Sequence, residues 1–414
     1  MKIYTFDISI KNLFSYHVSF TLFGYCLIAP LSDLIIPNAE VGYLTILYRI
    51  LVLFSSLFYI SVIFFYIKKL CIVGVGKMAL YTLFLFWFIY TLRLLYDVNF
   101  QSNSLGDGTF INYLITGYGF VLIPLFSMMM SYDRQDLVKI FVRSFYILLV
   151  GVVLAIIVST YKIITLESLW GVRFATERMN PISLGRYSTV LFLLAYALYQ
   201  LKERPVSILY FAMLIGGIGL LLSGSRGALV SSFVILLINL FTRAKLKNII
   251  MLPILFSVIF YFTLSLLSIL LPEFNLIENY FKMGSGADKS AQIRFQLYNG
   301  ALDQFYNSPI IGDLIVERAF KFYPHNHILE VLMATGILGL SVYLGLNVLV
   351  MTKLVQLKRS GFPQVLVKAL INIYIFFLIS GMFSGALIAA EGFWFVLVII
   401  CFTSFENKRI RYPC

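Results

Sequence analysis

The sequence predicts an all-α fold, that of a polytopic integral membrane protein with about twelve transmembrane helices. Of the 414 residues, 60% are hydrophobic and only 12% are charged. That is too little charge to keep a soluble domain of this length in solution. The apolar stretches repeatedly approach the roughly 20 residues that a helix needs to cross a hydrocarbon core of about 30 Å. The alternation over about ten residues that is typical of membrane β-strands is absent from the sequence.

The apolar stretches define the predicted spans, whose boundaries are approximate at both ends. They run near residues 17–36, 43–66, 78–96, 111–131, 141–162, 183–200, 206–222, 229–242, 250–271, 325–348, 365–382 and 386–404. The eighth is short, and we expect it to begin earlier, inside the preceding glycine-rich stretch. The sequence shows neither an internal repeat nor a separate soluble domain, so residues 1–414 are expected to form one membrane domain. A cleavable signal peptide is not expected, because the N-terminus lacks a short apolar core followed by small residues.

Basic residues set the expected orientation. Twenty of the 32 lysines and arginines fall on the side that holds both termini, and eight fall in the opposite loops. Positive residues mark the cytoplasmic side, so both termini are predicted to be cytoplasmic. The formal net charge of +13 is therefore explained by membrane topology, and nucleic acid is not an expected partner.

The longest connection, residues 272–324, is then predicted to be external. Within it, residues 292–306 have the pattern of an amphipathic helix, with apolar residues recurring at four-residue steps. Asn307, Ser308 and Pro309 are expected to end this helix, and Gly312 to lie in a turn. The apolar face favours an ordered loop over a disordered one.

The four cysteines are not expected to form disulfides. Cys26 and Cys401 lie in apolar runs, and Cys71 and Cys414 lie in basic segments assigned to the cytoplasm, where disulfides are rare. Walker and Rossmann signatures are absent from the sequence, so the protein is not expected to use energy from cytoplasmic nucleotides. No metal and no cofactor are expected.

Arg226 follows a fully apolar run and is flanked by Gly224 and Gly227. Glycines and serines allow a sharp turn and close approach to a ligand. A guanidinium beside the first N–H groups of a helix makes an anion site. The alternative is that Arg226 only marks a loop at the membrane surface.

His325 and His327 are two of the three histidines in the chain, and they occur together at the entry to a predicted span. A histidine titrates near neutral pH and can transfer a proton. The alternative is structural, with Asn326 capping the helix and Glu330 complementing its dipole. His327 is expected to point elsewhere and to pack at the surface. Zinc is disfavoured, because residues two apart on a helix point in different directions.

Each of the other charged residues in or near the spans has a functional and a structural interpretation. Arg294 lies on the polar face of the loop helix, where a solvated charge is the simplest explanation. Asp33 and Glu391 lie within predicted spans, where a carboxylate is either functional or paired with one of the arginines near the outer ends of spans, such as Arg186. Together the polar residues suggest a cationic, proton-transferring site at the external surface. A membrane-anchored substrate that carries its own activation, a lipid diphosphate, would suit that site.

Five short motifs occur in a fixed order and resemble those of the O-antigen ligase and polymerase superfamily. They are Ser223-Gly-Ser-Arg-Gly-Ala-Leu229, Arg294-Phe-Gln-Leu-Tyr-Asn-Gly-Ala301, Ser308-Pro-Ile-Ile-Gly312, His325-Asn-His-Ile-Leu-Glu330 and Thr335-Gly-Ile-Leu-Gly339. The resemblance covers roughly residues 165–345. Outside that range, only the hydropathy pattern is similar.

The resemblance implies a metal-independent glycosyltransferase of the bacterial inner membrane, which moves a glycan from undecaprenyl diphosphate at the periplasmic face. By motif position, Arg226 and Arg294 would bind the diphosphate, and His325 would act as the base or position the acceptor. The expected supporting residues are Ser223, Ser225, Asn326, Glu330 and Arg178. The expected partners are the lipid-linked oligosaccharide donor and acceptor, membrane lipid and a chain-length regulator protein.

Three functions remain open on the sequence. The Ser-Gly-Ser-Arg-Gly form favours an O-antigen polymerase, which adds the glycan to a further lipid-linked repeat unit. An O-antigen ligase would instead transfer it to the lipid A core. A transporter of polysaccharide or lipid-linked oligosaccharide would also have about twelve spans, and it should show paired broken helices in its two halves.

Overall fold

The structure is a computed structural model that describes residues 2–35, 42–66, 74–101, 104–106, 108–165, 174–241, 265 and 289–404. In this part of the chain the regular elements are all helical, which confirms the predicted all-α class. In order they are α1 (Lys2–Ile35), α2 (Tyr43–Tyr66), α3 (Val75–Phe100), α4 (Thr109–Tyr113), η2 (Leu114–Leu122), α5 (Ile123–Ser127), α6 (Arg134–Ile164), α7 (Pro181–Leu201), α8 (Val206–Leu222), α9 (Arg226–Phe241), α12 (Lys289–Asn307), α13 (His327–Arg359), α14 (Gln364–Ser380), η3 (Leu387–Ala389) and α15 (Glu391–Phe402).

The described helices include seven that are long and apolar enough to cross a membrane. Four further apolar helices, α8, α9, α14 and α15, are shorter. The first eight predicted spans and the last three each coincide with helix. The eighth begins at Arg226, inside the glycine-rich stretch as expected. The predicted span at residues 250–271 lies outside the described residues apart from Ser265.

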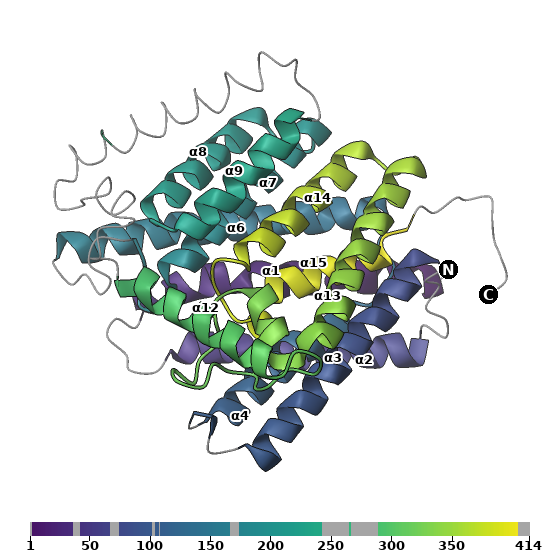
Figure 1. Cartoon of the computed structure of the whole chain (residues 1–414). Coiled ribbons are helices and arrows are strands. Elements are labelled where there is room, and N and C mark those ends of the chain that lie inside the picture. The colour runs from purple at the N-terminus through teal and green to yellow at the C-terminus, as the bar shows by residue number, and fades with distance from the viewer. Residues whose placement is uncertain are drawn as a thin grey trace.

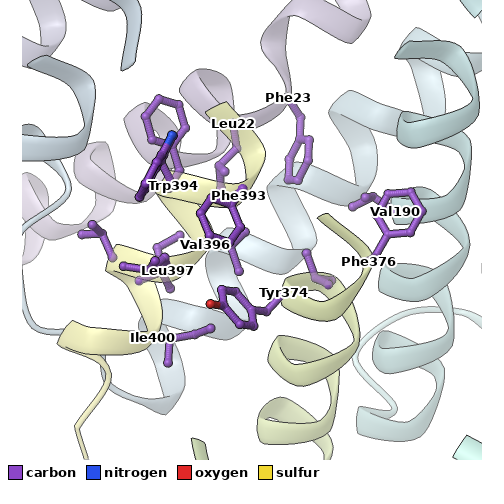
Figure 2. Packing of buried hydrophobic residues seen from close by; sticks show 14 of the residues in the cluster. Leu22, Phe23, Val190, Tyr374, Phe376, Phe393, Trp394, Val396, Leu397 and Ile400 are labelled. Atoms are coloured by element: carbon purple, nitrogen blue, oxygen red, sulfur yellow. The ribbon is translucent and has the colours of Figure 1, made fainter. Parts of the chain in front are cut away.

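α15 is the central helix of the bundle. Every residue from Phe393 to Phe402 is buried, as expected for a helix that is apolar on all sides. It is packed against α1, α3, α5, α13 and α14. Figure 2 shows its side chains meeting those of neighbouring helices, with Phe393 beside Tyr374 of α14. The indole N–H of Trp394 donates to the carbonyl oxygen of Leu387 at 2.8 Å, so the buried ring has no unsatisfied donor.

α7, α8 and α9 pack against one another, and α12 lies beside α13 (Figure 1). The predicted amphipathic helix is therefore present, as α12. Its Leu297 and Ala301 are buried, whereas Ile293 at the start of the same stripe is exposed. α12 ends at Asn307, and Gly312 follows with φ +77°, both as predicted.

α13 is broken at Gly336, where φ is +61° and ψ is −158°. The break is filled by the loop that follows α12. The N–H groups of Ile337 and Leu338 donate to the carbonyl oxygens of Pro309 (2.8 Å) and Ile310 (3.2 Å). A Cβ on Gly336 would lie only 2.5 Å from the backbone of Ile310. The backbones of two motifs, the one at residues 308–312 and the one at residues 335–339, thus fit together and hold the loop against α13.

The same loop is also anchored to α3 by a buried ion pair between Arg93 and Asp97. Asp97 Oδ2 accepts from the N–H of Ile315 at 2.9 Å, and Arg93 donates to the carbonyl oxygen of Gly312 at 3.2 Å. Farther out, Arg318 forms a two-pronged pair with Asp313, with contacts of 2.8 and 2.7 Å. These contacts fix the chain that leads to His325.

Candidate functional site

Four helix ends meet on one side of the bundle. They are the beginnings of α7, α9 and α13 and the end of α14. Their approach is close enough to require glycine. A Cβ on Gly185 would lie 2.8 Å from Ser223 Oγ, and one on Gly227 would lie 2.8 Å from Phe383 Cβ. The polar motifs that the sequence singled out are brought together at this junction.

Arg226 and Arg294 line one cavity of about 240 Å³, which we call the arginine cavity. They come from helices separated in the sequence, α9 and α12. Ser225 and the stretch Ser380–Ser384 also contribute to its walls. Two guanidinium groups facing one small cavity make a site for an anion with several oxygens.

The turn before α9 aims Arg226 into this cavity. Gly224 has φ +59°, which only glycine adopts without strain. Ser223 Oγ accepts from the N–H of Ser225 at 3.2 Å, and the carbonyl oxygen of Ser225 accepts from the N–H of Leu229 at 3.0 Å. Arg226 is consequently the first residue of the helix. Both serines are buried and shape the turn, and Ser225 also lines the cavity.

His325 lies in the loop just before α13, with its backbone in the left-handed region at φ +57°. A non-glycine residue held there costs roughly 1–3 kcal/mol and is typical of functional positions. Its ring packs edge-on against Tyr323, with centroids 4.7 Å apart. Burial, with a smaller contribution from the positive charge of Arg294, lowers the pKa of His325 from 6.5 to about 4. The imidazole is therefore neutral near pH 7 and able to accept a proton.

Asn326 caps α13 as expected, because its side-chain oxygen accepts from the N–H groups of Ile328 (3.0 Å) and Leu329 (3.2 Å). Glu330 is fully buried. Its carboxylate accepts from the hydroxyl of Tyr90 at 3.2 Å and from the N–H of Leu387 at 2.9 Å. It thus ties α13 to α3 and η3 and does not line the arginine cavity.

The expectation that His327 packs at the surface is wrong. The side chain is buried, and the backbone N–H of His327 donates to the carbonyl oxygen of Gly381 at 3.2 Å. A Cβ on Gly381 would collide with the imidazole ring, so the end of α14 closes over this histidine. The first turn of α13 faces other helices on this side, and the packing excludes His327 from the surface.

Arg186 is a site residue that the sequence analysis placed only near the outer end of a span. Its Nε donates to Ser380 Oγ at 2.7 Å, and its Nη2 donates to the carbonyl oxygen of Ser384 at 2.7 Å. Through these hydrogen bonds Arg186 stabilises a wall of the arginine cavity. The sequence signal for this role was the position of Arg186, since an arginine inside an apolar span needs polar partners.

Arg178 lies away from the arginine cavity. Its guanidinium pairs with Asp33, and with Glu177 at 3.3 Å, so the ion-pair reading of Asp33 is correct. Glu391, which lies within the predicted last span, is the first residue of α15 and lines a second cavity. In the described part of the chain, groups of three or more potential metal ligands are absent.

Comparison with known families agrees with these motifs. A family model described as O-antigen ligase matches residues 211–312, a region that contains both Arg226 and Arg294. No curated protein matches the chain. The matched region carries the two arginines of the cavity in the order the motifs require, and the match supports the resemblance of this region to the O-antigen ligase and polymerase superfamily.

Proposed function

We propose that this protein is an O-antigen polymerase, which transfers a glycan from undecaprenyl diphosphate to a further lipid-linked repeat unit. The observation that carries this proposal is the arginine cavity, where Arg226 and Arg294 share one space. A diphosphate presents several oxygens that planar guanidinium groups can grip in pairs. His325 does not line this cavity, but the charge of Arg294 contributes to lowering its pKa, and His325 is the proposed base.

The reaction needs one displacement. A hydroxyl oxygen of the acceptor sugar attacks the anomeric carbon of the donor glycan, and the bond from that carbon to the diphosphate oxygen breaks. His325 takes the hydroxyl proton, and the arginines hold the charge that develops on the departing undecaprenyl diphosphate. Each such group typically contributes about 10²–10⁴-fold in rate.

An O-antigen ligase is the second candidate, because the matching family model carries that description. The two functions use the same donor and differ only in the acceptor, which is the lipid A core for a ligase. The purified protein, reconstituted with undecaprenyl-diphosphate oligosaccharide, should extend a second lipid-linked repeat unit. Transfer to lipid A core without chain growth would identify the ligase instead.

A transporter receives less support from the geometry. The break in α13 resembles the discontinuous helices of transporters, whose freed N–H groups point at substrate. Here the freed N–H groups of Ile337 and Leu338 are already bonded to the carbonyl oxygens of Pro309 and Ile310. Vesicles in which the protein moves lipid-linked oligosaccharide without forming a new glycosidic bond would favour transport.

We also propose where the protein is located and which partners it binds. We place the protein in the bacterial inner membrane with both termini in the cytoplasm and the arginine cavity facing the periplasm. The basic cytoplasmic loops support this orientation. The proposed partners are the lipid-linked donor and acceptor, membrane lipid and a chain-length regulator, and no metal ion takes part in the reaction.

A further inference from the structure

A second cavity, of about 340 Å³, has Arg186 and Gly381 in its lining. We call it the carboxylate cavity, because Glu391 lines it at the start of α15. Its walls come from α1, α2, η2, α7, α13, α14, η3 and α15. Its volume falls in the range of cavities that hold small ligands.

Three charged residues line this cavity, Arg49, Arg186 and Glu391. Arg186 is held by Ser380 and Ser384, as described above. The positive charge of Arg49 acts on Glu391, but within the part of the chain that the structure describes the Glu391 carboxylate forms neither a hydrogen bond nor an ion pair. Its oxygens can therefore accept hydrogen bonds from a ligand in the cavity.

The cavity also presents aromatic surface. Tyr25 and Tyr48 line it, and their hydroxyls are committed to backbone carbonyl oxygens, of Arg178 at 2.6 Å and of Phe20 at 3.1 Å. Their rings are therefore held rigidly. Rigid rings together with a carboxylate and a guanidinium match a sugar, which has hydroxyl donors and acceptors around an apolar face.

The residues His325 to His327 lead into α13. His327 lines the carboxylate cavity, and the charge of Arg294, which lines the arginine cavity, acts on His325. One wall of the carboxylate cavity is therefore only two residues from the proposed base.

We propose that the carboxylate cavity binds the acceptor sugar, with Glu391 accepting a hydrogen bond from one of its hydroxyls. This rests on the proposed function, since only a glycosyl transfer needs an acceptor beside the donor diphosphate. Glu391 is a binding and positioning residue, and His325 keeps the role of base.

The test is protection of engineered cysteines from a maleimide, which does not depend on turnover. In a cysteine-free protein, Ser183→Cys reports on the carboxylate cavity and Val230→Cys reports on the arginine cavity. The probes are undecaprenyl diphosphate alone and the oligosaccharide released by mild acid from the host's own lipid-linked repeat units. The oligosaccharide should slow labelling at position 183 but not at position 230, and undecaprenyl diphosphate should do the reverse.

Glu391→Gln should raise the oligosaccharide concentration needed for half protection at position 183 about tenfold, and leave protection at position 230 by undecaprenyl diphosphate within twofold. The second measurement shows that the variant is folded. Equal protection at position 183 with and without the Glu391 substitution, or no protection there at all, would overturn the acceptor site. Failure of undecaprenyl diphosphate to protect position 230 would instead count against the proposed donor, and so against the proposed function.

Discussion

The guanidinium geometry of Arg226 matters more than its charge. It begins α9 and shares the arginine cavity with Arg294, so a diphosphate between them would be gripped by two planar forks. An ammonium has the same charge but cannot form paired, parallel hydrogen bonds. Arg226→Lys should therefore lower kcat/KM for the donor nearly as much as Arg226→Ala, by roughly 10²-fold or more. Transfer rates at matched protein levels measure this, and a lysine variant with near-normal rates would show that charge alone suffices.

With His325 as the base, the reaction rate should begin to fall only at an unusually low pH. Burial and Arg294 hold its pKa at about 4, below the ordinary 6.5, so the base stays neutral until the pH falls close to 4. The profile of log kcat/KM against pH should accordingly bend near pH 4. Arg294→Gln removes one lowering influence and should move the bend upward, whatever it does to the absolute rate. Arg204→Gln, at an exposed position, is the matched control. A bend near 6.5 in the unmodified protein would exclude this environment for the base.

Single residues were predictable where the sequence carries a local signal. Arg226 and Arg294 lie in motifs and line one cavity, whereas His325 is not among the residues that line it. His327 was misjudged because burial on the first turn of α13 depends on Gly381, which is more than fifty residues away. Arg186 was undervalued for the same reason, since its partners lie on α14 and the loop beyond it.

At the scale of elements, the broken helix α13 positions the site. Gly336→Ala would place a side chain at φ +61° and against the backbone of Ile310. Backbone strain of this kind costs roughly 1–3 kcal/mol, and relieving it would push the 308–326 loop away from α13. We expect a lower melting temperature in detergent and reduced transfer. Gly345→Ala is the matched control, because its Cβ would meet open space on the same helix. Equal melting temperatures for the two variants would contradict the role of the break.

Hydropathy predicted the helices well and their interruptions poorly. Apolar runs identified the described spans, and four-residue spacing identified α12. The break at Gly336 and the π-helix at Leu114–Leu122 lie inside apolar runs, where hydropathy does not change. The hydrogen bond between Asp97 and Ile315 joins residues far apart in the chain, and no local sequence pattern predicts such a bond.

At the scale of the whole molecule, the proposed orientation can be tested with two exposed positions. Tyr306 at the end of α12 is 70% exposed, and Arg204 lies in the short connection between α7 and α8. In a cysteine-free protein, an impermeant maleimide should label Tyr306→Cys in intact spheroplasts and Arg204→Cys only after lysis, because the basic loops are expected in the cytoplasm. The opposite pattern would place the arginine cavity on the cytoplasmic side.

We propose that Arg226, Arg294 and His325 act together to transfer a glycan from a lipid diphosphate. Chain growth by purified His325→Ala protein, reconstituted with undecaprenyl-diphosphate oligosaccharide and compared with the unmodified protein at equal amounts, tests it most directly. We predict a ladder of extended glycans from the unmodified protein and a loss of roughly 10²–10⁴-fold in rate for the variant, with its melting temperature nearly unchanged. A His325→Ala protein that builds the same ladder at the same rate would show that His325 is not the base and is only a helix-entry residue.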